Sequence, residues 1–482
     1  MASVKKTLTM RGFKGWVTQR PPALLVEGEA QTADNVEVEK GTIRRRPGWT
    51  LIATPSASAI TGLHPFYFQT TKHLLAIDGI TLRYSTGGAF TTISSSLAPS
   101  TPAYGTFATM QDSAYTAINY GADLTQALKK WDGTTFSTSS SPSGGIVSSY
   151  GNALWLAGDR GTGNKPSRLY WSGTAGITGP DTWPATNYVD LSPGDGDKIT
   201  GMGHLINALI VFKERSIHKV VGVQPDNAST STGSLGVTSL LDQPGCVAPR
   251  TVASSENLVW YLGRDGVYVF DGVGPKEVTA SIRPFFTTLD PTNYAFANGT
   301  LITPTHYVLS VLNNSAVRVM LSIHLLPGGP FITQWTGLPA SSLSTFILTG
   351  TVGQQLIFGF NDGKVGYGVG NTDNGTAISW LWRSGSLNSI GSNFLIKTIR
   401  RGYLRGTVTN YTVTIKLYRD FGTGSATTSV NFTPTASETA INKRFVTALT
   451  GRELEIELSG TSTAAAPEIT DLTLEHITRY RG

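Results

Sequence analysis

The feature that most constrains the fold is a succession of short β-prone runs, each bounded by Gly, Asp, Asn or Pro. Runs of this kind have the usual length of a β-strand. Uninterrupted stretches with the apolar spacing of an amphipathic helix are almost absent. The pattern therefore predicts an all-β chain. Its clearest runs are His73–Ile77, Ala208–Phe212, Leu258–Leu262, Val267–Phe270, His306–Leu312 and Gln355–Phe360.

The turns between the runs repeat as well. Asp-Gly pairs suit the positive φ angles of tight hairpins, and they begin at Asp78, Asp132, Asp265, Asp271 and Asp362. Two of them directly follow an aromatic residue, in Trp131-Asp132-Gly133 and Phe270-Asp271-Gly272. Successive spacings are 54, 40, 49 and 50 residues when the markers are Gly79, Gly133, Gly173, Gly222 and Gly272.

A unit of this length with four short strands is typical of a β-propeller blade. Each blade is a small twisted sheet, and its two faces are covered by the neighbouring blades. Residues 51–376 have room for about seven blades, and we accept six to eight. A set of β-sandwiches is the alternative, since it also uses short strands and Gly-rich turns. The repeated aromatic-Asp-Gly ending favours the propeller.

The two ends of the chain differ from this repeat. Residues 377–482 alternate between apolar and polar, as in Tyr411–Leu417 and Arg452–Ser459, and predict an antiparallel β-sandwich. In the second segment the glutamates at 453, 455 and 457 are expected to face solvent. Residues 1–50 predict an extended N-terminal arm. It ends in a hairpin of residues 35–38 against 42–46.

Composition excludes several classes of protein. The 482 residues include a single cysteine, Cys246, so a disulfide scaffold and a Cys-rich zinc site are excluded. No apolar run approaches the roughly 20 residues that span a bilayer, and no signal peptide is recognisable at the N-terminus. We therefore expect a chain without a membrane-spanning segment that stays in the cytoplasm where it is made. The net charge of +6 permits a nucleic-acid partner without requiring one.

No pattern of an enzyme or metal site stands out. The seven histidines are scattered, without a His-Glu-x-x-His pair. Gly161–Lys165 lacks the spacing of a phosphate loop and is interpreted as a surface loop. Asp195-Gly196-Asp197 lacks the carboxylates of a calcium loop and is interpreted as a turn. Cys246 is expected to be a small buried apolar residue. We predict no catalytic residue, no metal and no cofactor.

Two basic clusters are the candidate contact residues. Arginine pairs well with phosphate oxygens, so either cluster is a candidate for contact with DNA or with another subunit. Solvated strand faces are the simpler alternative. The clusters consist of Arg44, Arg45 and Arg46, and of Arg400, Arg401 and Arg405.

Several segments resemble bacteriophage tail proteins. Ala33–Gly48 resembles their N-terminal signature, which is an Asn-Val pair, a short charged turn and basic residues that end in Arg-Pro-Gly. Further segments are similar to the middle and the end of these proteins. They are Gly194–Met202, Leu209–Ile217, Gly245–Val252, Trp260–Gly272 and Lys397–Asp420.

The resemblance implies a β-propeller protein of the tail hub or nozzle of short-tailed phages. Such proteins form a ring, usually six-fold, below the portal and adaptor, and DNA passes through its centre. The expected partners are copies of the same chain, the portal or adaptor, other tail proteins and DNA in the lumen. The expected location is the virion tail, after assembly in the host cytoplasm. The family has no catalytic residues to carry over, so we expect a structural protein and not an enzyme.

Two other functions stay open at this point. A propeller that cleaves glycans of the host surface would need paired carboxylates near its central channel. Asp159, Asp195 and Asp265 are acids that could serve if the fold brought them together. A carbohydrate-binding propeller at the tip of the tail is the second alternative.

Overall fold

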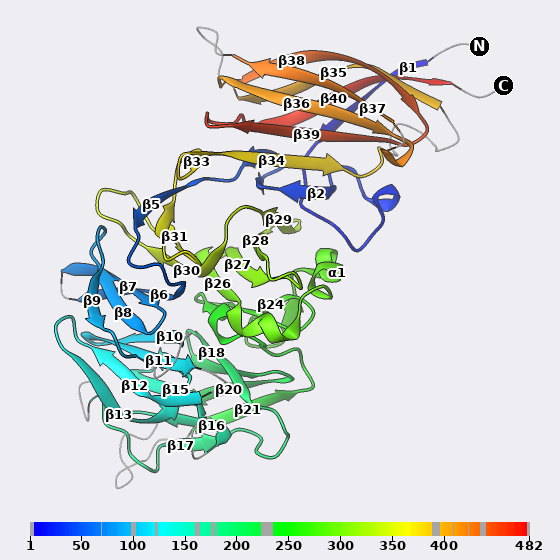
Figure 1. Cartoon of the computed structure of the whole chain (residues 1–482). Coiled ribbons are helices and arrows are strands. Elements are labelled where there is room, and N and C mark those ends of the chain that lie inside the picture. Colours follow the sequence, from blue (N-terminus) through cyan, green and yellow to red (C-terminus); the bar gives the residue numbers. More distant parts are fainter. Residues whose placement is uncertain are drawn as a thin grey trace.

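The computed structural model describes residues 4–68, 70–97, 103–120, 124–159, 164–174, 179, 181–222, 235–387, 396–407, 409–422, 424–433 and 440–479. Within these ranges, seven blades of four strands follow one another around a ring. Five of them are separate antiparallel sheets, and the last two belong to a larger sheet that continues into the sandwich. A β-sandwich lies beside the ring and contains the C-terminal strands (Figure 1). The prediction of a β-propeller of about seven blades with a C-terminal sandwich is confirmed.

Blades one to four are consecutive meanders. Blade one contains β6 (Ile60–Phe68), β7 (Thr71–Asp78), β8 (Thr81–Ser85) and β9 (Thr91–Ser94). Blade two contains β10 (Ala103–Met110), β11 (Ser113–Tyr120), β12 (Leu124–Trp131) and β13 (Phe136–Gly144). Blade three contains β14 (Ile146–Tyr150), β15 (Ala153–Asp159), β16 (Lys165–Trp171) and β17 (Tyr188–Asp190). Blade four contains β18 (Ile199–Leu205), β19 (Ala208–Lys213), β20 (Ser216–Gly222) and β21 (Leu235–Leu241).

Blades five and six are also consecutive meanders, whereas blade seven takes its outer strand from another part of the chain. Blade five contains β22 (Ala253–Ser254), β23 (Val259–Leu262), β24 (Val267–Phe270) and β25 (Pro275–Glu277). Blade six contains β26 (Asn298–Thr303), β27 (His306–Leu312), β28 (Arg318–Leu326) and β29 (Gly329–Trp335). Blade seven contains β30 (Ala340–Phe346), β31 (Gln355–Phe360) and β32 (Val365–Gly368), and its outer strand is β5 (Trp49–Ala53) from the N-terminal segment.

The ring closes through this N-terminal strand. β5 pairs antiparallel with β32, with Leu51 opposite Gly366 and Trp49 opposite Gly368. The inner strand β30 of blade seven contacts the inner strand β6 of blade one, so the first and last blades pack together. Because β5 immediately precedes blade one in sequence, this pairing links the two ends of the ring.

The sandwich is built from two antiparallel sheets. One sheet contains β34 (Thr376–Ser384), β39 (Leu454–Ser462), β36 (Tyr411–Arg419) and β37 (Gly424–Phe432). The other contains β38 (Ala440–Gly451), β35 (Ile396–Thr407), β40 (Ile469–Arg479) and β1 (Val4–Arg11). The predicted inward positions Tyr411, Val413, Ile415 and Leu417 are buried in the core between the sheets.

The N-terminal segment runs along both parts of the molecule. β1 pairs with β40 over its whole length. β2 (Ala30–Asp34) lies between β29 of blade six and β34 of the sandwich, so one continuous sheet joins the two parts. The predicted hairpin is present as β3 (Val36–Glu39) and β4 (Thr42–Arg45), and Val36 lies opposite Arg45. Short helical turns complete the described fold. They are η1 (Pro22–Leu24), η2 (Pro249–Thr251), η3 (Ala280–Ile282), α1 (Arg283–Phe286), η4 (Pro291–Phe296) and η6 (Asp420–Gly422).

One expectation about the sandwich is wrong. Glu455 was expected to face solvent, but it is 2% exposed. Its carboxylate accepts hydrogen bonds from Arg383 at 2.6 Å and from Gln31 at 2.9 Å. Glu453 is also buried and accepts a hydrogen bond from Ser386. The outer face of this sheet is partly covered by the N-terminal segment, so alternation in β39 does not separate core from solvent.

Within the described part of the chain, no helix has the length and apolar character needed to cross a bilayer.

Arg46 lies where the N-terminal segment meets blade seven and the sandwich. Its guanidinium is 1% exposed and donates to Asp373 of β33 (Thr372–Asp373) at 2.6 and 2.9 Å. The Arg46 Nε donates to the Asn35 side chain at 2.8 Å. Gly48 packs so closely against Thr372 that a Cβ would lie 2.0 Å from its carbonyl oxygen. The Arg-Pro-Gly sequence therefore has a structural reason at this junction.

We expect Asp373→Ala to lower the free energy of unfolding by about 3–5 kcal/mol, because it leaves the buried Arg46 guanidinium without its carboxylate. Asp362→Ala is the control. It breaks an ion pair to Lys364 whose two side chains are 55% and 40% exposed, for Asp362 and Lys364 respectively, and should cost less than about 1 kcal/mol. Denaturant unfolding of both variants measures the difference. Equal losses would contradict the role assigned to Arg46.

Candidate functional site

The central channel of the propeller is narrow. It is a cavity of about 300 Å³ lined by the inner strands, including glycines at 62, 105, 203 and 299. A Cβ at Gly105 would lie 2.5 Å from Ile77, and one at Gly203 would lie 2.7 Å from Val259. These glycines allow strands to pack closely near the axis. His64 also lines the channel, where burial lowers its pKa to about 4.

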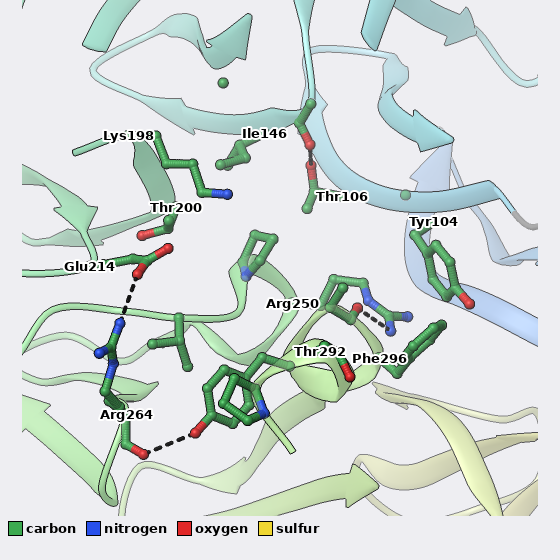
Figure 2. Close-up of a pocket in the computed structure, with 18 residues that line it drawn as sticks. Tyr104, Thr106, Ile146, Lys198, Thr200, Glu214, Arg250, Arg264, Thr292 and Phe296 are labelled. Carbon is green, nitrogen blue, oxygen red and sulfur yellow. Dashed lines mark hydrogen bonds and ion pairs between the residues drawn. The ribbon is translucent and has the colours of Figure 1, made fainter. Parts of the chain in front are cut away.

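A larger pocket opens where β10, β14 and β18 begin, opposite η4 (Figure 2). Its volume is about 460 Å³, which is within the range of small-molecule sites. Figure 2 shows Lys198, Thr200 and Glu214 on one side and Tyr104, Arg250 and Phe296 on the other. The strand starts of three blades thus form one part of its wall, and the segments around Arg250 and η4 form another.

Arg250 is the most unusual residue of this pocket. It is buried, and it donates to the carbonyl oxygens of Thr61 at 2.6 Å and Ala295 at 3.3 Å. The Tyr104 ring lies 4.9 Å from the guanidinium carbon. Burial and, to a smaller extent, the neighbouring Arg318 lower the pKa of Arg250 to about 10, while Tyr104 opposes the shift. The guanidinium is therefore held by carbonyl oxygens and an aromatic face.

The charges of the pocket favour a polar or anionic ligand. Lys198, Arg250 and Arg264 line it, and Glu214 is the one carboxylate among the described lining residues. Glu214 lies 3.3 Å from the Arg264 guanidinium. A glycosidase of the usual kind needs two carboxylates that flank the scissile bond. The described lining residues do not supply such a pair.

Each of the three acids considered for glycan cleavage has an interaction partner of its own. Asp195 forms an ion pair with the buried Lys213 at 2.8 Å. Asp265 accepts a hydrogen bond from Tyr268 at 2.7 Å, and Asp159 accepts one from Tyr170 at 3.4 Å. These acids do not line the pocket of Figure 2.

Two smaller expectations from the sequence are confirmed. The Asp195-Gly196-Asp197 segment is a turn, in which Asp197 accepts backbone hydrogen bonds from Lys198 at 2.8 Å and Arg215 at 2.9 Å. Cys246 is buried, and burial raises the pKa of its thiol to about 12. A thiol with this environment is a packing residue and a poor nucleophile.

The first basic cluster is engaged inside the protein. Arg44 is half-buried and lies 2.8 Å from Glu37. Arg45 donates to the carbonyl oxygens of Ser462 at 2.7 Å and Ala464 at 3.0 Å. Arg46 is enclosed at the junction described above. Arg44 is therefore the member of this cluster with substantial exposure, and its contact with DNA or a subunit stays a prediction.

The second cluster lies on the outer sheet of the sandwich. Arg400 and Arg405 of β35 are exposed, whereas Arg401 pairs with Glu475. Arg405 lies 3.9 Å from Asp471. Arg444 of β38 joins Arg400 and Arg401 around a shallow pocket of about 230 Å³. Sequence reasoning missed Arg444, because only the pairing of β35 with β38 brings it to this cluster.

Comparison with known proteins does not show a family. No family model matches the chain, and no curated protein matches it. Among solved structures, it is similar to BBS1N in complex with ARL6DN, with 10% identity and a TM-score of 0.39 over 68% of this chain and 99% of that chain. The fucose-specific lectin from Aleuria aurantia is 14% identical, with a TM-score of 0.32 over 60% of this chain and 99% of the lectin.

A third similar structure is the exo-β-1,3-galactanase from Phanerochaete chrysosporium. It is 11% identical, with a TM-score of 0.30 over 89% of this chain and 100% of the galactanase. These proteins differ widely in function and are distant from this chain. Their activities therefore carry no weight for this chain.

Proposed function

We propose that the chain is a structural protein that assembles into a ring, as a hub or nozzle component of a phage tail. The resemblance of Ala33–Gly48 and the other segments to tail proteins supports the tail assignment. The continuous sheet through β29, β2 and β34 supports a mechanical role, because it joins the propeller and the sandwich into one block. In this proposal the protein has no catalytic step.

Two uncharged outer strands carry the proposal of assembly. β21 in blade four and β37 in the sandwich each form backbone hydrogen bonds with one neighbouring strand in the described structure, and β37 also packs near β38 of the facing sheet. Neither strand contains a charged residue or a proline. Leu241 of β21 is 56% exposed and Val237 is 38% exposed. Soluble proteins usually protect edge strands with charges, proline or a covering element, since an open edge can pair with another chain.

A ring needs two different surfaces on each copy, so that one subunit binds head-to-tail to the next. β21 and β37 lie at opposite ends of the molecule (Figure 1). An edge in the propeller and an edge in the sandwich therefore provide two distinct contact surfaces. Strand edges and loops would then hold the ring together.

The lumen of the proposed ring lies between subunits and not within one propeller. The propeller channel has a volume of about 300 Å³, which is the size of a small-molecule site. It has no room for duplex DNA, whose major groove alone is about 12 Å wide. DNA would therefore pass through the space that several copies enclose. The exposed arginines of β35 and β38 are the residues we assign to this DNA.

We expect electron microscopy of the purified chain at high concentration to show closed rings, six-fold by analogy with the similar tail proteins. Ser425→Lys/Ser429→Lys places charges on exposed positions of β37 and should leave monomers, because lysine blocks strand addition at an edge.

Thr412→Lys/Thr461→Lys is the control for this experiment. It adds two charges at exposed positions of the interior strands β36 and β39 and should keep the rings. Strictly monomeric wild-type protein at every concentration, or equal effects of the two double variants, would contradict assembly through β37.

We also expect weak DNA binding that disappears as salt increases. Arg400→Ala/Arg444→Ala should reduce the slope of log K against log salt concentration by about 2, since each arginine neutralises about one phosphate. Arg215→Ala/Lys276→Ala removes two exposed basic side chains from the propeller and should leave the slope unchanged. Fluorescence anisotropy with a labelled duplex measures the slope. Absence of binding at low salt would remove these arginines from the DNA surface.

A further inference from the structure

Two histidines face each other on blade six. His306 of β27 lies directly opposite His324 of β28, and their rings stack with centroids 3.6 Å apart. Glu37 of β3 approaches the same place from the N-terminal hairpin. One ligand atom from each of the three side chains lies within 4.8 Å of the other two. This cluster is separate from the pocket and the channel described above.

The cluster is enclosed. Glu37 and His306 are buried, and His324 is mostly buried. A neutral imidazole keeps a lone pair on one ring nitrogen, and that nitrogen can bind a metal ion. His306 Nε2 lies 2.9 Å from the Ser322 hydroxyl. His324 Nε2 is buried without a hydrogen-bond partner in the described structure.

A buried nitrogen without a hydrogen-bond partner destabilises the folded protein unless a further group binds it. Water is one occupant, but the neighbours of this atom include a second imidazole and a carboxylate. Two histidines and a glutamate form one of the protein ligand sets of zinc. Imidazole ligands also select zinc and similar ions over magnesium and calcium, which prefer oxygen.

We propose that Glu37, His306 and His324 bind one divalent transition-metal ion, with zinc as the best chemical fit. Ligand atoms about 2.0–2.1 Å from a tetrahedral zinc lie about 3.4 Å apart. The ligand atoms of the three side chains, which lie within 4.8 Å of one another, would have to approach one another by about 1 Å. The fourth position would be taken by water or by a further side chain.

Arg44 gives the carboxylate of Glu37 its orientation. Its guanidinium lies 2.8 Å from Glu37 Oε2. Metal-bound carboxylates are usually held by such a hydrogen-bond partner outside the ligand shell. Glu37 is therefore fixed by the hairpin itself, in which Glu37 lies opposite Arg44.

The ion would fasten the N-terminal hairpin to the propeller. Glu37 belongs to the hairpin of β3 and β4, which pairs with β40 of the sandwich, whereas both histidines belong to blade six. Because an ion that binds only the folded state stabilises it, the site would strengthen the joint between the two parts. The ligands are far apart in sequence, so no short metal-binding motif reveals them.

The first test uses the full chain after treatment with a chelator. Equilibrium dialysis should give one zinc per chain, and cobalt should give the visible absorption of a site with nitrogen ligands that zinc abolishes. Zinc should raise the Tm, and magnesium should not. Failure to bind zinc or cobalt would overturn the proposal.

Variants then locate the ion. His324→Ala should abolish the cobalt spectrum, and Glu37→Gln should weaken zinc binding by about ten-fold or more. His204→Ala is the control, because His204 is exposed in blade four and outside the cluster. Circular dichroism of the metal-free variants checks that they fold. Unchanged binding in folded His324→Ala would overturn the assignment.

A measurement on the wild-type chain does not depend on the variants. Crystals soaked with zinc should show an anomalous peak among Glu37, His306 and His324. A peak at any other place, with none in this cluster, would overturn the proposal even if the variants fail to fold.

Discussion

The structure depends on the pairing of β5 with β32. A propeller is a ring of small sheets, and each sheet needs a neighbour on both faces. Blades one and seven have no chain connection across their contact except the one that β5 supplies. The strand is held next to the junction at which buried Arg46 binds Asp373 and Gly48 packs against Thr372. Loss of this pairing would leave blade seven without its outer strand and the ring without its link.

The same segment also determines how the propeller and sandwich are joined. β1 lies along β40, and β2 lies between β29 and β34, so the first fifty residues contribute strands to both parts. A structure joined in this way resists separation of its parts, because relative movement would break backbone hydrogen bonds. That property suits a component of an assembly that passes force or DNA, and the clustered His306, His324 and Glu37 lie at the same joint.

Much of the propeller could be predicted from the sequence because its hairpins are local. The Asp-Gly turns lie between strands that are adjacent in the chain, so periodicity and turn chemistry reveal them. The partner of β5 could not be predicted, since β32 lies far along the chain and β5 looks like any other short strand. The pattern of charged residues in the sequence also left their burial and their partners undetermined. It does not show that Arg46 is buried against Asp373, that Arg383 and Gln31 cover Glu455, or that Arg444 lies beside Arg400.

Hydrogen exchange of the native chain, followed by mass spectrometry, tests the closure of the ring most directly. The amides of β5 that are hydrogen-bonded to β32 should exchange as slowly as those of β31 in the same blade, because both strands would open only when the blade unfolds. Rapid exchange throughout β5, with β31 and the rest of blade seven still protected, would contradict closure of the propeller by its N-terminal strand.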